Sequence, residues 1–220
     1  MYRDDLAYIH HHGFSEFAES AAPFVVSLLH EHDVKTVVEL GCGTGVLARE
    51  LTQAGFDVQG FDASPSMIAI AGETAPLACF DVARFGDVRA ECDAIVAMGE
   101  VLNYGTLDDV RALLENTRAT LFVFDVAERG AYPPYDEHRS GGDDWSVIAI
   151  KESDGERLTR RVLTFRADGR RDDETHHLHL YDREELSTLL RAHGFRLEIR
   201  QSYGARDLPK GHALYVAVHL

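Results

Sequence analysis

A tight run of glycines between two apolar segments constrains this chain more than any other feature of its sequence. The residues Val37-Val38-Glu39-Leu40 lead into Gly41-Cys42-Gly43-Thr44-Gly45, and Val46-Leu47-Ala48 follow. This order predicts a strand, a sharp turn and the first turn of a helix. Because glycine tolerates positive φ and has no Cβ, the backbone can turn sharply here and approach a ligand closely. Amide groups at the helix start then face whatever lies over the turn, so the sequence predicts a nucleotide-type cofactor site built from backbone.

The glycine spacing and the acidic residue before it indicate which cofactor binds. The dinucleotide fingerprint G-x-G-x-x-G directs its amides at a pyrophosphate. Here the third glycine comes one residue early, at Gly45, and Val46 occupies the last position of the fingerprint. The carboxylate of Glu39, two residues before the first glycine, would repel a phosphate and attract an ammonium group. S-adenosylmethionine (SAM) carries an ammonium group and no phosphate, so it is the predicted cofactor.

From Glu39 to Gly45 the chain resembles the class I SAM-dependent methyltransferases, whose first motif reads E/D-x-G-x-G-x-G. The resemblance implies a Rossmann-like fold and SAM-binding roles for Glu39, Gly41, Cys42 and Gly43. A βα turn that binds no ligand is the alternative for the motif by itself.

A second acidic residue ends the next expected strand. Residues 56–61 predict that strand, and Asp62 follows it. It lies about 20 residues beyond the glycines, where a carboxylate can accept hydrogen bonds from ribose hydroxyls. A simple helix-capping role for Asp62 is compatible with ribose binding. The resemblance implies that Asp62 binds the ribose, with Ala63 beside it, and that Met67 flanks the adenine.

Two later segments match the family in the same order. Residues 77–80 predict a short strand that ends at Asp81-Val82, where the family places an acidic contact to the adenine amino group. Residues 93–98 predict the fourth strand, which ends at Gly99-Glu100 and leads to Tyr104. The resemblance implies that Gly99 and Glu100 meet the methionyl part of SAM, with the acceptor nearby.

Length and charge agree with a single enzyme domain. A chain of 220 residues can bury a sizeable core in one α/β domain. A net charge of −15 argues against DNA or RNA as the partner, because nucleic-acid binding needs a basic surface. The three cysteines lack a C-x-x-C spacing, no apolar stretch is long enough to cross a bilayer, and no signal-peptide pattern is present. We therefore expect a cytoplasmic protein.

The remaining patterns predict a doubly wound α/β fold with a mostly parallel, seven-stranded sheet. Helices are expected near 15–31, 46–54, 65–74, 106–118 and 183–193, and a buried parallel strand over 121–126. Two last strands, near 195–203 and 212–219, complete the sheet. Pro23 predicts a break or kink in the first of these helices.

Between the fifth strand and the late helix lies an insertion of some 55 residues. Residues 127–143 are rich in Pro, Gly and charge and predict a loop. Three antiparallel strands are then expected at 145–150, 157–166 and 175–181, joined by turns at Asp154-Gly155 and Asp168-Gly169. The insertion leaves from the edge of the sheet where ligands bind, so it can wall the active site. A dimerisation or purely structural role is the open alternative.

The resemblance narrows to a group of bacterial methyltransferases with a Y-I-H-H-x-G-F opening, a D-W strand, an E-x-H strand and a C-terminal Y-G. These motifs stand here at residues 8–14, 144–145, 174–176 and 203–204. Asn116-Thr117-Arg118-Ala119-Thr120 lacks the glycine pair that usually precedes strand five.

The acceptor side is predicted to involve a small molecule bound by Tyr104, Trp145 and His11. Glu174 and His176 share one face of their strand, so the carboxylate can orient the imidazole as a general base. A structural role for each histidine is the alternative. His177 and His179 would need a further ligand to hold a metal, and none is evident, so no metal site is predicted.

The sequence thus predicts one domain over 1–220. It comprises an N-terminal helical cap (1–33), a SAM-binding core (34–126), an insertion or substrate cap (127–181) and a C-terminal helix with two strands (182–220). The predicted activity is in-line methyl transfer from SAM to a small molecule. A catalytically silent SAM-binding module is one alternative, and an NAD-dependent oxidoreductase is another. The sequence identifies neither the acceptor nor the oligomeric state, monomer or homodimer.

Overall fold

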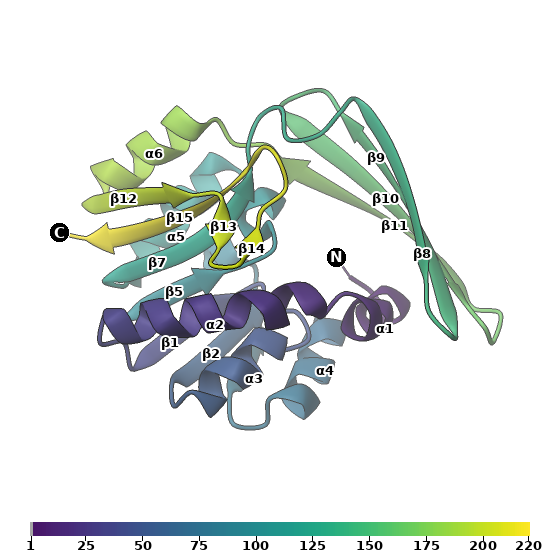
Figure 1. The fold of residues 1–220 in the computed structure, drawn as a ribbon, viewed down its shortest axis with the longest axis horizontal. Helices are drawn as coiled ribbons and strands as arrows, with labels where there is room; N and C mark the ends of the chain where they lie inside the picture. Colours follow the sequence, from purple (N-terminus) through teal and green to yellow (C-terminus); the bar gives the residue numbers. More distant parts are fainter. Residues whose placement is uncertain (1) are drawn as a thin grey trace.

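The computed structural model describes residues 2–220, and its centre is a seven-stranded sheet with the spatial order β12-β15-β7-β5-β1-β2-β3 (Figure 1). Strands β1, β2, β3, β5 and β7 are parallel, and β15 runs antiparallel to both β7 and β12. The predicted doubly wound, mostly parallel sheet is confirmed. In chain order its strands are β1 (Thr36–Leu40), β2 (Asp57–Asp62), β3 (Cys79–Val82), β5 (Ala94–Ala97), β7 (Leu121–Ala127), β12 (Phe195–Arg200) and β15 (His212–His219).

Helices cover both faces of this sheet, because each presents an apolar stripe to it. One core holds buried side chains of α2, α3 and the end of α4 against β1 and β7, and the other holds those of α5 and α6. Every residue of β7 is buried, as expected for a central parallel strand. The helices are α1 (Asp4–Gly13), α2 (Glu16–Glu31), α3 (Val46–Gln53), α4 (Pro65–Thr74), α5 (Leu107–Asn116) and α6 (Arg183–Ala192), with the 3₁₀ turns η1 (Phe85–Asp87) and η2 (Val101–Tyr104).

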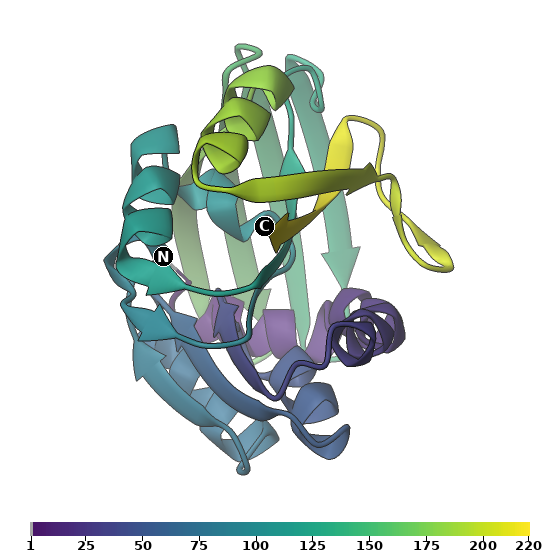
Figure 2. The ribbon, with the colours of Figure 1, turned by 90° about the vertical axis from the view of Figure 1, so that its left-hand side faces the viewer.

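The insertion forms a separate antiparallel sheet of four strands, in the order β11-β10-β9-β8. Figure 2 shows it behind the large sheet, and Figure 1 shows α1 near its lower end. Glycines with positive φ, Gly155 and Gly169, occupy the two predicted turns. Its strands are β8 (Tyr135–Gly141), β9 (Trp145–Ser153), β10 (Arg157–Arg166) and β11 (Arg171–His179).

The fourth strand corrects the prediction of a loop over 127–143. Strand β8 is a largely exposed edge strand with the sequence YDEHRSG, so it shows no apolar alternation that could reveal it. Its backbone pairs with β9 along its whole length, and Asp136 forms an ion pair with Lys151 at 3.2 Å. The strand is therefore specified by its partner and not by its own sequence.

Two features of the N-terminal segment also differ from expectation. A break or kink was predicted at Pro23, and the helix α2 has no break there, since it is continuous from Glu16 to Glu31. Pro23 is exposed, so water can satisfy the helix carbonyl that its missing N–H leaves unpaired. In addition, the segment before α2 forms a helix, α1, which the sequence patterns did not indicate.

Four short strands form two small sheets beside the main one: β4 (Ala90–Glu91) with β6 (Thr117–Arg118), and β13 (Ser202–Tyr203) with β14 (Arg206–Asp207). Across residues 2–220, no helix has both the length and the apolar character that a bilayer span requires.

Candidate active site

A cavity of about 500 Å³ lies at the carboxyl ends of β1, β2 and β5. This is the edge where ligands bind in open α/β sheets, and the volume is that of a small-molecule site. The segment around α1 and the strand β11 complete its walls. The residues predicted from the sequence that line it are Glu39, Gly41, Cys42, Asp62, Ala63, Met67, Gly99, Tyr104 and His176.

The glycine turn takes the left-handed conformation that the sequence predicted. Gly41 and Gly45 have φ of 61° and 77°. A Cβ on Gly41 would lie 2.3 Å from Val101 Cγ2, and a Cβ on Gly45 would lie 3.0 Å from the Ala71 backbone. The turn therefore needs glycine at these positions for close packing as well as for backbone conformation.

Two carboxylates line the cavity beside this turn, Glu39 in β1 and Asp62 at the end of β2. Asp62 accepts hydrogen bonds from the amides of Gly43 at 3.0 Å and Ser64 at 2.8 Å, so Gly43 acts on the site through Asp62 and does not line the cavity. Glu39 is 4% exposed, and its Oε2 has no hydrogen-bond partner within the described residues.

The electrostatics of this pair favour a positively charged ligand. Burial and the nearby Asp62 raise the pKa of Glu39 to about 8, and burial also raises the pKa of Asp62. A cation between them would relieve both effects. Arg84 is the only Lys or Arg among the described residues that line the cavity. The site therefore fits a cationic group far better than a pyrophosphate.

The wall next to the expected adenine position differs from the prediction. Asp81 and Val82 do not line the cavity, because both are exposed at the end of the edge strand β3. Asp81 instead accepts a 3.5 Å hydrogen bond from Gln59. The next residues along the chain, Ala83–Gly86, line the cavity in their place, opposite Met67.

Glu100 is also placed differently from the prediction. Gly99 lines the cavity as expected, but Glu100 takes the left-handed conformation with φ of 62°. Its side chain turns away from the cavity to accept hydrogen bonds from Arg160, Tyr132 and His212. It is therefore not placed to bind SAM directly.

One wall of the cavity is aromatic. The ring centroids of Tyr2 and Tyr104 lie 5.1 and 5.9 Å from that of His176, and His10 lies next to Tyr2. The hydroxyl of Tyr104, both ring nitrogens of His176 and Nδ1 of His10 are buried without partners within the described residues. Unpartnered polar atoms around one space are what a polar ligand would satisfy.

His176 is a neutral imidazole in this setting. Burial, with a smaller contribution from Arg160, lowers its pKa to about 4. Its Nε2 lies 3.6 Å from Oε2 of Glu174, which is the strand-face neighbour that the sequence predicted. Both side chains are buried on one face of β11. His177 lines the cavity from this edge strand, and across residues 2–220 no group of three or more His, Cys, Asp or Glu is arranged to hold a metal ion.

Trp145 and His11 do not reach the cavity. Trp145 packs against Phe14, and its ring lies so close to Gly13 that a Cβ there would be 2.4 Å away. It belongs to the small core between α1 and the insertion sheet. Because α1 is a helix, consecutive residues point in different directions, so His10 lines the cavity and His11 packs against His12.

Several lining residues had no sequence signal of their own. Phe17 and Ala18 reach the cavity from the start of α2, a helix that the sequence predicted without giving these residues a place in the site. Tyr2 and Ser15 lie outside any motif. Their position depends on α1, which bridges the two walls: Ser64 donates to the Tyr2 carbonyl at 2.5 Å, and the Arg3 amide donates to Glu174 at 2.9 Å.

Comparison with known proteins gives one family. A family model described as a methyltransferase domain matches residues 10–198. The magnesium-protoporphyrin O-methyltransferase of Rhodobacter capsulatus is 35% identical over 104 residues, which are 44% of this chain and 46% of that protein. The glycine/sarcosine N-methyltransferase of Parasynechococcus marenigrum (strain WH8102) is 36% identical over 90 residues, 37% of this chain and 32% of that protein. The matched regions thus span less than half the length of both relatives.

Solved structures share the whole fold. The amino pentose methyltransferase CalS10 of Micromonospora echinaspora, determined with SAM bound, superimposes with a TM-score of 0.74 at 20% identity. The match covers all of this chain (100%) and 98% of that one, so it includes the insertion sheet.

Proposed function

The chain belongs to the methyltransferase domain family, and from this premise we propose that it is a SAM-dependent enzyme that methylates the nitrogen of a small amine. One observation carries the cofactor part of the proposal. The glycine turn, the buried carboxylate of Glu39 and the half-buried carboxylate of Asp62 face a single cavity, and Glu39 Oε2 has no partner among the described residues. A ligand with an ammonium group and ribose hydroxyls satisfies both carboxylates.

In this proposal the cofactor lies along the floor of the cavity. Asp62 accepts hydrogen bonds from the ribose hydroxyls, while Glu39 and the amides of Gly41 and Cys42 surround the amino-acid part. Ala63 and Met67 contact the adenine, and Gly99 contacts the methionyl chain. Asp81 and Val82 were expected next to the adenine, but Ala83–Gly86 line the cavity there, so we assign the adenine wall to Ala83–Gly86. When bound, SAM supplies a methyl group on a sulfonium, which is already electrophilic.

The chemistry of the acceptor wall favours nitrogen. Tyr104 and His176 present unpartnered polar atoms there. With a pKa lowered to about 4 by burial, His176 holds a proton too weakly to generate an alkoxide or a phenolate. A neutral amine attacks through its own lone pair and needs no proton removed beforehand. The Tyr104 hydroxyl and the His176 ring can orient that lone pair in line with the C–S bond.

The atoms balance without a covalent enzyme intermediate. The N–C bond forms while the C–S bond breaks, and the sulfur keeps the electron pair as S-adenosylhomocysteine leaves. The nitrogen then carries the positive charge, and the product leaves as an ammonium that exchanges its proton with water outside the cavity. The methylating relatives named above divide between nitrogen and oxygen acceptors, and the weak base in this cavity is the reason that we favour nitrogen.

The finer features of this proposal rest on sequence. A net charge of −15 supports a small-molecule acceptor over nucleic acid. The three free cysteines support a reducing, cytoplasmic location. We propose that residues 34–126 form the cofactor-binding core, that 127–181 form the acceptor cap, and that 1–33 and 182–220 complete one domain.

Two measurements on the purified protein test the proposal. Titration calorimetry with SAM and with NADH is expected to show binding of SAM only. A screen with methyl-tritiated SAM is then expected to label primary or secondary small amines and to leave phenols and hydroxy acids unlabelled. Transfer to oxygen acceptors only would overturn the nitrogen assignment. Tight SAM binding without transfer to any acceptor would instead indicate a silent binding module.

A further inference from the structure

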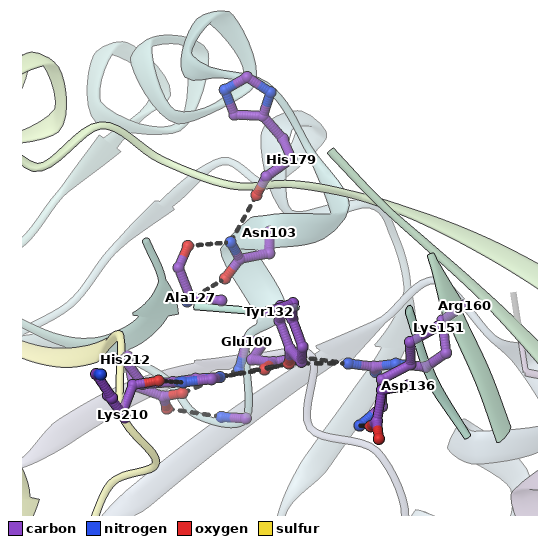
Figure 3. A network of polar contacts seen from close by, with 12 residues as sticks. Glu100, Asn103, Ala127, Tyr132, Asp136, Lys151, Arg160, His179, Lys210 and His212 are labelled. Atoms are coloured by element: carbon purple, nitrogen blue, oxygen red, sulfur yellow. Dashed lines mark hydrogen bonds and ion pairs between the residues drawn. The ribbon is translucent and has the colours of Figure 1, made fainter. Parts of the chain in front are cut away.

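The carboxylate of Glu100 joins three parts of the chain that are distant in sequence. It accepts a 2.8 Å hydrogen bond from Arg160 of β10, another from Tyr132 in the segment before β8, and a 2.6 Å contact from Nε2 of His212 at the start of β15. Figure 3 shows Arg160 and His212 reaching Glu100 from opposite sides. Glu100 and Arg160 are only 13% and 17% exposed, so this is a buried ion pair.

A second carboxylate, that of Asp125, holds the backbone of Gly99 and Glu100. Asp125 is 2% exposed and accepts hydrogen bonds from the backbone amides of Gly99, at 2.7 Å, and Glu100, at 3.0 Å. The hydroxyl of Tyr203 donates to Asp125 at 2.6 Å. This contact gives a physical role to the Tyr203-Gly204 motif, which the cofactor and acceptor sites do not use.

The segment around Glu100 also borders the cavity next to the glycine turn. Gly99 and Val101 both line the cavity, one on each side of Glu100. The Val101 side chain packs directly over Gly41 of the glycine turn, where it leaves no room for a Cβ. Any rotation of the Glu100 backbone would therefore move a wall of the cofactor site.

We propose that Glu100 and Asp125 are positioning residues that hold Gly99 and Glu100 in the left-handed conformation, and that Arg160 of the insertion thereby sets the affinity for SAM. A non-glycine residue with positive φ is strained and persists only where its surroundings fix it. The amides are fixed by Asp125 and the side chain is fixed by the insertion. The insertion sheet is thus coupled to the cofactor floor through Glu100. This inference rests on the proposed function, since it assumes that SAM occupies the cavity.

Arg160→Met tests the coupling, and Arg161→Met is the matched control. Arg160 does not line the cavity, and methionine keeps much of its apolar stem while removing its hydrogen bonds. Arg161 is the next residue on the same strand, is exposed, and pairs with Asp173 on the opposite face. Titration calorimetry with SAM is expected to show a Kd about tenfold higher for Arg160→Met, which corresponds to about 1.4 kcal/mol. The Kd of Arg161→Met should stay within about twofold of wild type.

Two further variants keep the inference decidable if Arg160→Met does not fold. Tyr132→Phe removes one donor to Glu100 and keeps the ring, so it should also raise the Kd for SAM. Arg160→Lys retains a cation and should recover part of the lost affinity, which a purely structural defect would not predict. Circular dichroism must show each variant fully folded at the temperature of the titration.

The outcomes separate this inference from the proposed function. If folded Arg160→Met and Tyr132→Phe bind SAM as tightly as wild type, the coupling is refuted and the proposed function stands. If Arg160→Met does not fold, Tyr132→Phe with wild-type affinity refutes the coupling by itself. A folded wild type that binds no SAM refutes both.

Discussion

Replacing Glu39 by glutamine should remove most of the pH dependence of SAM binding on the acid side of neutrality. Burial and Asp62 raise the pKa of Glu39 to about 8, so the carboxyl group of the free protein is mostly protonated at pH 7. A cationic ligand binds the ionised form. Ionising the group before binding therefore costs about 1.4 kcal/mol at pH 7 and about 2.7 kcal/mol at pH 6. The Kd of wild type for SAM should therefore fall about tenfold as the pH rises from 6 to 7.

The assay is titration calorimetry at pH 6.0, 6.5 and 7.0, each in two buffers with different ionisation enthalpies. The buffer difference counts protons released on binding. Wild type should release about one proton more per SAM than Glu39→Gln at pH 6.5, because only wild type must ionise this side chain. The measurements end at pH 7.0 because the α-amino group of SAM titrates at about pH 8 and would itself add a pH dependence above that range.

Glu39→Gln is a close control because Asp62, the other group with a raised pKa, is present in both proteins. The ratio of the two SAM affinities should shift about tenfold in favour of wild type from pH 6 to pH 7, because only wild type must ionise Glu39 on binding. Equal proton release by both proteins would show that Glu39 does not meet the cationic group. The same raised pKa predicts that the free energy of unfolding of the free wild-type protein falls as pH rises from about 4.5 to about 8. Glu39→Gln lacks this titration and should not show the decrease.

Three other substitutions have defined outcomes. Asp62→Ala should raise the Kd for SAM about 10- to 100-fold through the loss of charged hydrogen bonds, whereas Asp81→Ala should leave it within about twofold, as measured by calorimetry. Gly41→Ala should lower the free energy of unfolding by about 3 kcal/mol, because its Cβ meets a side chain, while Gly43→Ala has open space and should cost about 1 kcal/mol in denaturant titrations. His176→Gln should lower kcat on an amine acceptor at least about tenfold with the Kd for SAM unchanged, and full turnover would remove His176 from the mechanism.

The sequence was sufficient to predict the large sheet and the position of the glycine turn and Asp62 at the cavity because their signals are local. The glycine turn, the acidic residue after the second strand and the apolar run of β7 each lie within a few consecutive residues. Asp62 illustrates this: its carboxylate is held by Gly43 and Ser64, which belong to the two adjacent turns. Parallel strands bring such turns to one edge without any further information.

The insertion sheet and the N-terminal helix α1 were less predictable because distant partners specify their structure. Strand β8 has a polar sequence and exists through pairing with β9. The start of α1 is held through Tyr2 and Arg3, which contact Ser64 and Glu174, residues more than 60 positions away in the chain. Without that helix, the sequence placed His11 at the cavity, and only the helix phase reveals that His10 is the residue directed there.

Glu100 shows most clearly why position along the chain does not determine the role of a side chain. It directly follows Gly99, which lines the cavity, and the family resemblance implies that both residues meet the methionyl part of SAM. The Glu100 backbone is left-handed, and the partners of its side chain come from residues 132, 160 and 212. Those three contacts together hold the carboxylate ionised against its burial, since they keep its pKa below the usual range. A residue adjacent to a cofactor motif is thus the attachment point of the insertion sheet, and only the assembled fold could reveal it.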